Sequence, residues 1–345
     1  MKIPEMTFGA GWHLPHKTVP RQIPQKIELL SVDLLDENRS LVNDLKGLAK
    51  ILELELGWHY LLDLSWIIRN LGTVTGKRIM DAGAGTGLMQ WYLAQKGADV
   101  ISVDRQSRAA LPLRFRSYFH IRGLRAEDLL TPGQVLLQSL NKPKLLLKNL
   151  ASLFQHPMLP PTTDLDLAGE AQPEQRSAAK RKSTRSEPGH LPPGNIWIYN
   201  QDLASLKDIE DDSIDAVVAV SALEHNPPQS LTSVVNELLR VLKPGGALLA
   251  TLTASPEQDW WHEPSSGWCY SESSLQRLFD LPADTLSNYD QYAELFNDLR
   301  RCTELRDHLA SFYFQSDKNG MPWGKWDPQY LPVGVCKVKP RIAPA

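Results

Sequence analysis

The sequence predicts an α/β fold in which helices flank a mostly parallel sheet, and three observations lead to this prediction. Short apolar runs alternate with stretches of helical periodicity over much of the chain. A glycine-rich turn, "DAGAGTG" at residues 81–87, begins as the first of these apolar runs ends. A later run, "VISVD", ends in Asp104, which places an acidic residue at the carboxyl edge of the predicted sheet.

Composition and cysteine usage limit the classes of protein to consider. The chain has 345 residues, of which 42% are hydrophobic and 22% charged, so it is long enough to bury a core. Its three cysteines, Cys269, Cys302 and Cys336, lie far apart without a CxxC pair, which argues against a disulfide framework and a zinc site. The N-terminus lacks the apolar core of a signal peptide, and no run approaches the roughly 18 apolar residues of a membrane span. We therefore expect a soluble, cytoplasmic protein without a bound metal.

The N-terminal part, residues 1–72, is predicted to be an arm followed by two helices. Residues 1–39 contain four prolines and no sustained period, which is typical of an extended arm. A helix should begin near Ser40, a plausible N-cap, and present leucines on one face until Gly57 ends it. A second helix should follow over 58–71.

The main domain is predicted to comprise residues 73–104 and 195–345, with a helical and aromatic region at its C-terminal end. Apolar runs predict strands at 77–82, 99–103, 195–200, 214–221 and 247–253. Helical spacing predicts helices at 86–96 and 229–242, and "LKPGG" should end the second of these.

An insertion occupies residues 105–194, because the connection between the second and third strands is far longer than a crossover needs. Its first half, 105–155, is helical in pattern and carries nine Lys and Arg against two acidic residues, a local charge of +7 in a chain of net charge −3. This half suits an anionic surface or acceptor, or it is simply a cap over the active site. The second half, 156–194, is rich in Pro, Ser and charge, which predicts a disordered loop.

The glycine turn favours one nucleotide ligand over another. A dinucleotide fingerprint reads GxGxxG, whereas Gly83, Gly85 and Gly87 read GxGxG and Leu88 takes the place of the last glycine. Asp81 beside the turn would repel a pyrophosphate but would accept hydrogen bonds from an ammonium group. S-adenosylmethionine has such an ammonium and no phosphate, so these residues favour it over NAD.

Five segments in order strengthen this interpretation: "RIMDAGAGTG", "VISVD", "NQDLASL", "DDSIDAVVAVSALEHN" and "ELLRVLKPGGALLATL". In them the sequence resembles the class I S-adenosylmethionine-dependent methyltransferases, of the small-molecule type that includes quinone and sugar methyltransferases. The segments fall within 77–104 and 195–253, about a quarter of the chain. The resemblance implies a Rossmann-like, doubly wound, mostly parallel sheet of seven strands, with a helical N-terminal extension and an insertion between the second and third strands.

The resemblance also implies where the cofactor lies. It places the methionine end at the glycine turn, the ribose on Asp104 and the adenine amine near Asp202. The implied set is Asp81, Ala82, Gly83, Gly85, Gly87, Asp104, Arg105, Asp202, Leu203, Ser221 and Ala222. Two alternatives stay open, since Asp81 could bond only backbone amides of the turn and Asp202 could only cap the residues that follow it.

Catalytic and acceptor residues are less clearly marked. Aligning the reactants supplies roughly 7–11 kcal/mol, so a base is optional. The candidates are His225 and Glu224 in "LEHNPP", and His225 suits neutral pH better, although it could merely bond the loop. For the acceptor, aromatic rings suit a sugar or a ring-shaped molecule, or they pack on a long helix expected over 288–314. The tryptophans concerned are Trp260, Trp261, Trp268, Trp323 and Trp326.

We therefore expect methyl transfer from S-adenosylmethionine to an oxygen of a small-molecule, glycan or lipid-linked acceptor, with contact between 105–155 and an anionic membrane as a further possibility. The alternatives are a methyltransferase-like binding protein without catalysis, an NAD-dependent oxidoreductase and a nucleic-acid methyltransferase. Leu88 and the missing Tyr-xxx-Lys constellation weigh against the oxidoreductase. No RNA-binding module is visible, which ranks nucleic acid below the other acceptors.

Overall fold

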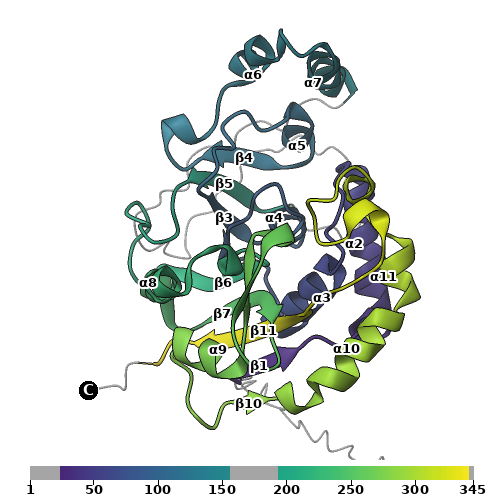
Figure 1. Cartoon of the computed structure of the whole chain (residues 1–345). Coiled ribbons are helices and arrows are strands. Elements are labelled where there is room, and N and C mark those ends of the chain that lie inside the picture. Colours follow the sequence, from purple (N-terminus) through teal and green to yellow (C-terminus); the bar gives the residue numbers. More distant parts are fainter. Residues whose placement is uncertain (1–23, 156–192, 342–345) are drawn as a thin grey trace, which may run out of the picture.

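The computed structural model describes residues 24–155 and 193–341, and it confirms the predicted α/β fold (Figure 1). The described strands form one sheet in the order β10-β1-β11-β7-β6-β2-β3-β5-β4, to which the hairpin β8–β9 is added beside β7. The central strands are parallel and match the five predicted from apolar runs. They are β2 (Arg78–Ala82), β3 (Asp99–Asp104), β5 (Asn195–Asn200), β6 (Ile214–Val220) and β7 (Leu242–Ala254).

Within residues 24–155 and 193–341 the sheet has eleven strands rather than the predicted seven, because parts of the chain outside the motifs contribute edge strands. Antiparallel pairing joins β11 to β7 and β1 to β11, and β10 runs parallel to β1. At the opposite edge, β4 pairs in parallel with β5. The added strands are β1 (Lys26–Leu29), β4 (His120–Gly123), β8 (Trp260–His262), β9 (Gly267–Tyr270), β10 (Leu286–Ser287) and β11 (Leu331–Val338).

The N-terminal part therefore differs from the extended arm that the prolines predict. Its residues 26–29 form β1, and two helices follow, α1 (Leu34–Glu37) and α2 (Arg39–Ile51). The prediction that α2 continues to Gly57 is wrong. Glu53 adopts a left-handed backbone conformation with φ of 51°, so the helix cannot continue through it.

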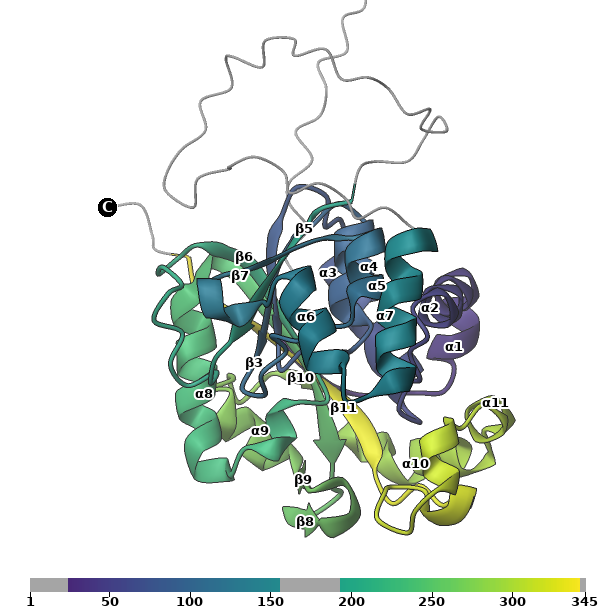
Figure 2. The same cartoon turned by 90° about the horizontal axis from the view of Figure 1, so that it is seen from above.

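Helices lie on both sides of the sheet, as the doubly wound prediction requires. Figure 2 shows α3 (Tyr60–Leu71) and α4 (Met89–Gln95) on one side and α8 (Pro228–Val241) on the other. Trp66 of α3 and Trp91 of α4 are fully buried in the core. The two helices that connect successive parallel strands, α4 and α8, confirm the predictions for 86–96 and 229–242 to within a few residues.

The prediction of one long C-terminal helix over 288–314 is wrong. It is divided into α10 (Tyr292–Arg301) and α11 (Thr303–Asp307), because Cys302 between them is extended, with φ of −66° and ψ of 106°. A further helix, α9 (Glu272–Leu278), precedes them. No helix in the described part of the chain is long and apolar enough to cross a membrane.

The first half of the insertion is mainly helical, as predicted, but it also supplies β4. Its helices are α5 (Leu113–Tyr118), α6 (Pro132–Ser139) and α7 (Pro143–Gln155). Phe115 of α5 stacks on Trp91 with ring centroids 4.5 Å apart, which fixes the insertion to the core. Figure 1 shows α6 and α7 beyond the β4 edge of the sheet. The disordered loop predicted for 156–194 lies, apart from its last two residues, outside the described residues.

Candidate active site

A cavity of about 370 Å³ opens where β2, β3, β5 and β6 end, at the carboxyl edge of the parallel sheet. This edge is where ligands bind in open α/β sheets. Of the eleven residues predicted to contact the cofactor, ten line the cavity, and Ala82 is buried in β2 beside it. The ten are Asp81, Gly83, Gly85, Gly87, Asp104, Arg105, Asp202, Leu203, Ser221 and Ala222.

The glycine turn brings two strand ends close together. The amides of Gly83 and Ala84 both donate to the carbonyl of Val103, at 2.9 Å each, so the turn is held against β3. Gly83 has a φ of 74°, and a Cβ added there would lie 2.5 Å from the Cβ of Ala222. Only glycine fits this conformation and this approach. Leu88, at the position of the last glycine in the GxGxxG fingerprint, is buried and packs in the core.

Asp81 is a buried carboxylate with an unused oxygen. Its side chain is 2% exposed, and Oδ2 has no hydrogen-bond partner although the residue lines the cavity. Burial raises the pKa of Asp81 to about 7, against the opposing effect of nearby Arg108. An unpaired buried oxygen costs free energy, so it favours a ligand that brings a donor.

Asp104 and Asp202 both support backbone as well as facing the cavity. Asp104 Oδ2 accepts from the amide of Gly85 at 2.8 Å, and its Oδ1 accepts from that of Gln106 at 2.7 Å. Each oxygen has a second lone pair, which leaves capacity for ribose hydroxyls. Asp202 Oδ1 accepts from the amide of Ala204 at 2.8 Å, so the capping role considered for it is present.

The two predicted base candidates lie in different surroundings. Residues 223–225 form a 3₁₀ turn after Ser221, whose φ of 45° is left-handed. His225 lines the cavity, and its Nδ1 lies 2.8 Å from the carbonyl of Ser266. Because a carbonyl only accepts, Nδ1 carries the proton of the neutral ring, and Nε2 keeps a lone pair for a proton.

Glu224, in contrast, points into the protein. It is 2% exposed, its Oε1 accepts from the hydroxyl of Ser221, and its Oε2 has no partner. Burial raises its pKa above the ordinary glutamate value. The structure therefore brings His225 to the cavity and leaves Glu224 behind it.

The sequence motifs missed one wall of the cavity, which comes from the loop between α2 and α3 and from α3 itself. Leu54, Leu56, Tyr60 and Leu64 line it, with Glu55. Behind Tyr60, the pair His59 and Asp63 is buried, with Nδ1 to Oδ2 at 2.7 Å. The sequence signal was a histidine and an aspartate four residues apart within an otherwise apolar helix, which indicates a buried polar pair.

None of the five predicted acceptor tryptophans, all within the described residues, lines this cavity. Trp260, Trp261 and Trp323 are exposed, whereas Trp268 and Trp326 are half-buried against the core. The hairpin β8–β9 carries three of them. It contacts the cavity wall where Ser266 bonds His225 and where the hydroxyl of Tyr270 donates to the carbonyl of Asn226. The structure thus does not bring the five tryptophans together, and their role in acceptor binding stays a prediction.

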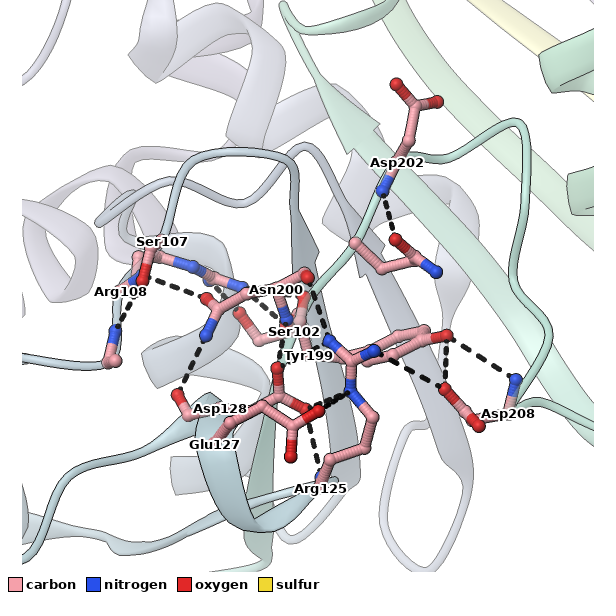
Figure 3. A network of polar contacts seen from close by, with 12 residues as sticks. Ser102, Ser107, Arg108, Arg125, Glu127, Asp128, Tyr199, Asn200, Asp202 and Asp208 are labelled. Carbon is pink, nitrogen blue, oxygen red and sulfur yellow. Dashed lines mark hydrogen bonds and ion pairs between the residues drawn. The ribbon is translucent and has the colours of Figure 1, made fainter.

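A polar network fixes the insertion to the end of β5, next to Asp202 (Figure 3). Asp128 is fully buried, and its Oδ1 accepts from the amide of Asn200 at 3.0 Å and from Arg125 at 2.9 Å. The guanidinium of Arg125 also lies over the ring of Tyr199, 5.0 Å from its centroid. The insertion is therefore part of the structure that supports the cavity.

Comparison with known proteins points the same way. Residues 163–250 match the model of a family described as "Methyltransferase domain". A ubiquinone biosynthesis O-methyltransferase of Leptothrix cholodnii is 33% identical over 78 residues, which cover 19% of this chain and 33% of that protein. Its counterpart in Acinetobacter baylyi is 40% identical over 43 residues, which cover 12% of this chain and 18% of that protein. The chain thus spans about a third or less of the length of these relatives.

Solved structures with a similar chain trace include the YcgJ protein of Bacillus subtilis and the [4+2]-cyclase SpnF. YcgJ is 15% identical with a TM-score of 0.40, over 81% of this chain and 99% of that one. SpnF is 13% identical with a TM-score of 0.44, over 92% of this chain and 100% of that one.

The sheet, the glycine turn and the family match over residues 163–250 agree with one another. They confirm its resemblance to the class I S-adenosylmethionine-dependent methyltransferases and its Rossmann-like α/β fold.

Proposed function

We propose that this protein transfers a methyl group from S-adenosylmethionine to an oxygen of a small-molecule acceptor. The observation that carries the proposal is the unpartnered Oδ2 of Asp81, buried at the glycine turn and lining the cavity. An ammonium group would satisfy this oxygen, whereas a pyrophosphate would be repelled by it. Asp104, with its remaining lone pairs, suits the ribose hydroxyls, so the residues present fit this cofactor.

S-adenosylmethionine supplies a methyl group bound to a positively charged sulfur, which an acceptor atom displaces in line. The task of the protein is to align the two reactants, and alignment supplies roughly 7–11 kcal/mol. We assign this task to the backbone at Ser221 and Ala222, which lies against Gly83 across the cavity wall.

We assign the role of general base to His225, because its Nδ1 is held by Ser266 while Nε2 is left to accept a proton from an acceptor hydroxyl. Glu224 is a positioning residue in this scheme. It acts through its hydrogen bond to Ser221 and does not reach the cavity.

The acceptor is proposed to be an apolar, ring-bearing molecule with a hydroxyl group. Leucines 54, 56 and 64 and the ring of Tyr60 give the cavity an apolar wall. The relatives from Leptothrix cholodnii and Acinetobacter baylyi are named for O-methylation in ubiquinone biosynthesis, which supports a small acceptor. A glycan or lipid-linked acceptor requires the exposed Trp260 and Trp261 to contribute. We place the reaction in the cytoplasm, where the three free cysteines would stay reduced.

Ligand-dependent melting tests the cofactor. We expect S-adenosylmethionine and S-adenosylhomocysteine to raise the melting temperature, because a ligand at 100 times its Kd stabilises a fold by about 2.7 kcal/mol. NAD at the same concentration should leave it unchanged, since Asp81 repels its pyrophosphate. An increase in melting temperature with NAD alone would contradict the proposed function.

We also propose that the α6–α7 hairpin contacts an anionic membrane surface. Leu137, Leu140 and Leu147 are 66%, 59% and 67% exposed. Lys142, between the two helices, and Lys144, in the first turn of α7, are exposed as well. Apolar side chains beside lysines suit the headgroup region of such a membrane. The surface charge is smaller than the local +7 suggests, because two of the nine cations, Arg108 and Arg116, are buried.

Sedimentation with anionic liposomes tests this surface. We expect the protein to cosediment at low salt and to dissociate as salt rises, because the attraction is screened. Replacing Leu137 and Leu147 by Gln should abolish cosedimentation. The control is Leu286→Gln, which changes a leucine that is 65% exposed at the far edge of the sheet. Absence of cosedimentation of the unaltered protein at low salt would remove the proposal.

A further inference from the structure

Arg108, near the start of the insertion, is a buried cation under the cofactor turn. Its side chain is 7% exposed. Nη1 donates to the carbonyl of Gly85 at 3.0 Å and to the hydroxyl of Ser102, and Nη2 donates to the carbonyl of Ser102 at 2.6 Å. A longer contact of 3.5 Å joins Nη2 to the carbonyl of Tyr199. One guanidinium thus connects the glycine turn after β2 with β3 and β5.

The backbone of Arg108 is fixed as firmly as its side chain. Its amide donates to Oδ1 of Asn200 at 2.8 Å, and Asn200 is held in turn by Asp128 (Figure 3). The position of the guanidinium is therefore set by the insertion and by the end of β5 together. Burying this cation costs free energy because it loses its hydration, unless hydrogen bonds and opposite charges compensate for the loss.

Three carboxylates act on this cation, Asp81, Asp104 and Asp128, and the first two are the ones proposed to hold the cofactor. Asp81 and Asp104 both stabilise the charged form of Arg108, although burial opposes it and lowers its pKa. In return, Arg108 is the one cation among the groups that act on Asp81, and Asp104 acts in the opposite direction. Without Arg108, Asp81 would lose the cation that favours its charged form, while Asp104 would still oppose that form.

We propose that Arg108 is a positioning residue of the cofactor site, which fixes the glycine turn through Gly85 and supplies the positive charge that acts on Asp81, the carboxylate proposed to receive the cofactor's ammonium group. The second part rests on the proposed function. The insertion thereby takes part in cofactor binding through a residue that lies outside the glycine-turn motif. The role requires both the charge and the planar fork of arginine, because the fork spans two strands and the turn.

Binding of S-adenosylhomocysteine, measured by calorimetry from pH 6 to 8.5, tests the proposal with Arg108→Gln and Arg108→Lys. The unaltered protein should bind more tightly as pH rises through about 7, where Asp81 loses its proton. Arg108→Gln should bind about fivefold more weakly at pH 7, and the loss should shrink at higher pH, because its midpoint moves upward by about one pH unit. Arg108→Lys should keep the midpoint near 7 but bind several-fold more weakly at every pH.

The matched control is Arg116→Gln, which removes another buried guanidinium from the same insertion. Arg116 donates to the carbonyl of Leu130 at 2.7 Å and is not among the groups that act on Asp81. Arg116→Gln should leave the midpoint of the pH dependence of binding unchanged. An equal loss at all pH values in Arg108→Gln, or full affinity in both Arg108 variants, would overturn the proposal. If Arg108→Gln does not fold, full affinity of the folded Arg108→Lys variant overturns the positioning role.

A measurement without ligand separates this proposal from the proposed function. The folded-state pKa of Asp81, about 7, is raised above the unfolded value, so its contribution to stability is complete at low pH and is lost as pH rises to about 7. The difference in melting temperature between the unaltered protein and Asp81→Asn should therefore vary with pH below about 7 and become constant above it. When both proteins also carry Arg108→Gln, this difference should keep varying up to a higher pH. Coinciding ranges would refute the charge role of Arg108. Separated ranges together with no binding of S-adenosylhomocysteine would refute the proposed function alone.

Discussion

Replacing His225 by alanine is expected to lower kcat by about 10²–10⁴ while the affinity for S-adenosylhomocysteine stays nearly unchanged. In the proposed reaction the imidazole acts on the acceptor through Nε2, because Nδ1 is held by the carbonyl of Ser266. Single-turnover rates with saturating cofactor provide the measurement once an acceptor has been identified by a gain of one methyl group in extracts.

Two further variants separate a base from a loop contact. His225→Asn keeps a donor for the carbonyl of Ser266 but removes the base, so it should be as slow as His225→Ala. Recovery of turnover in His225→Asn would instead mean that the hydrogen bond to the loop is what matters. The control is His308→Ala, because His308 is also exposed and its Nδ1 also lies 2.8 Å from a backbone carbonyl, that of Glu304, but it does not line the cavity. Turnover within a few-fold in all variants would mean that alignment alone carries the reaction.

Asp81→Asn is expected to weaken S-adenosylmethionine binding by on the order of 10²–10³-fold, because removing one partner of a buried charge pair costs about 2–5 kcal/mol. Calorimetry with S-adenosylhomocysteine measures the effect directly. In the unaltered protein, affinity should fall as pH decreases below about 7, since Asp81 then takes up a proton and loses its charge. The variant has no such group, so its weaker affinity should not vary over the same range.

Asp202→Asn is the matched control for this experiment. Asp202 lines the same cavity, but it is exposed, and one of its oxygens already accepts from the amide of Ala204. A change of a few-fold is expected, because an exposed carboxylate exchanges a contact with water for one with the ligand. Equal affinities of Asp81→Asn and the unaltered protein would contradict the assignment of Asp81 to the ammonium group.

The glycine turn and the strand ends could be predicted from sequence because their constraints are local. Gly83 follows an apolar strand directly, and its conformation depends on residues within a short segment. The predicted long helix over 288–314 failed at Cys302 because helical periodicity does not reveal where the backbone becomes extended. The first strand, β1, was also missed, since four residues are too few to show an alternating pattern and their partners lie in β11, at the other end of the chain.

The cavity wall and the acceptor region show a second kind of limit. Tyr60 lies on a helix whose apolar pattern explains its packing, and nothing local indicates that its ring faces the cofactor strands. The tryptophans were grouped because they lie close in sequence, yet Trp261 packs against Trp268 on the hairpin while Trp326 contacts Trp58. Their partners were chosen by the tertiary fold, so sequence spacing could not identify them.

The pairing of β1 with β11 has a consequence for biosynthesis. Lys26 lies opposite Cys336, so this edge of the sheet cannot form until almost the whole described chain has left the ribosome. Until then the edge of β7 is open, and the segment between β1 and β2, which includes the wall at Tyr60, has no fixed anchor on its N-terminal side. Closing so distant a contact is slow, and unpaired strand edges invite association between nascent chains. A growing chain can therefore complete its glycine turn early, but the enclosed cavity is among the last parts of the protein to mature.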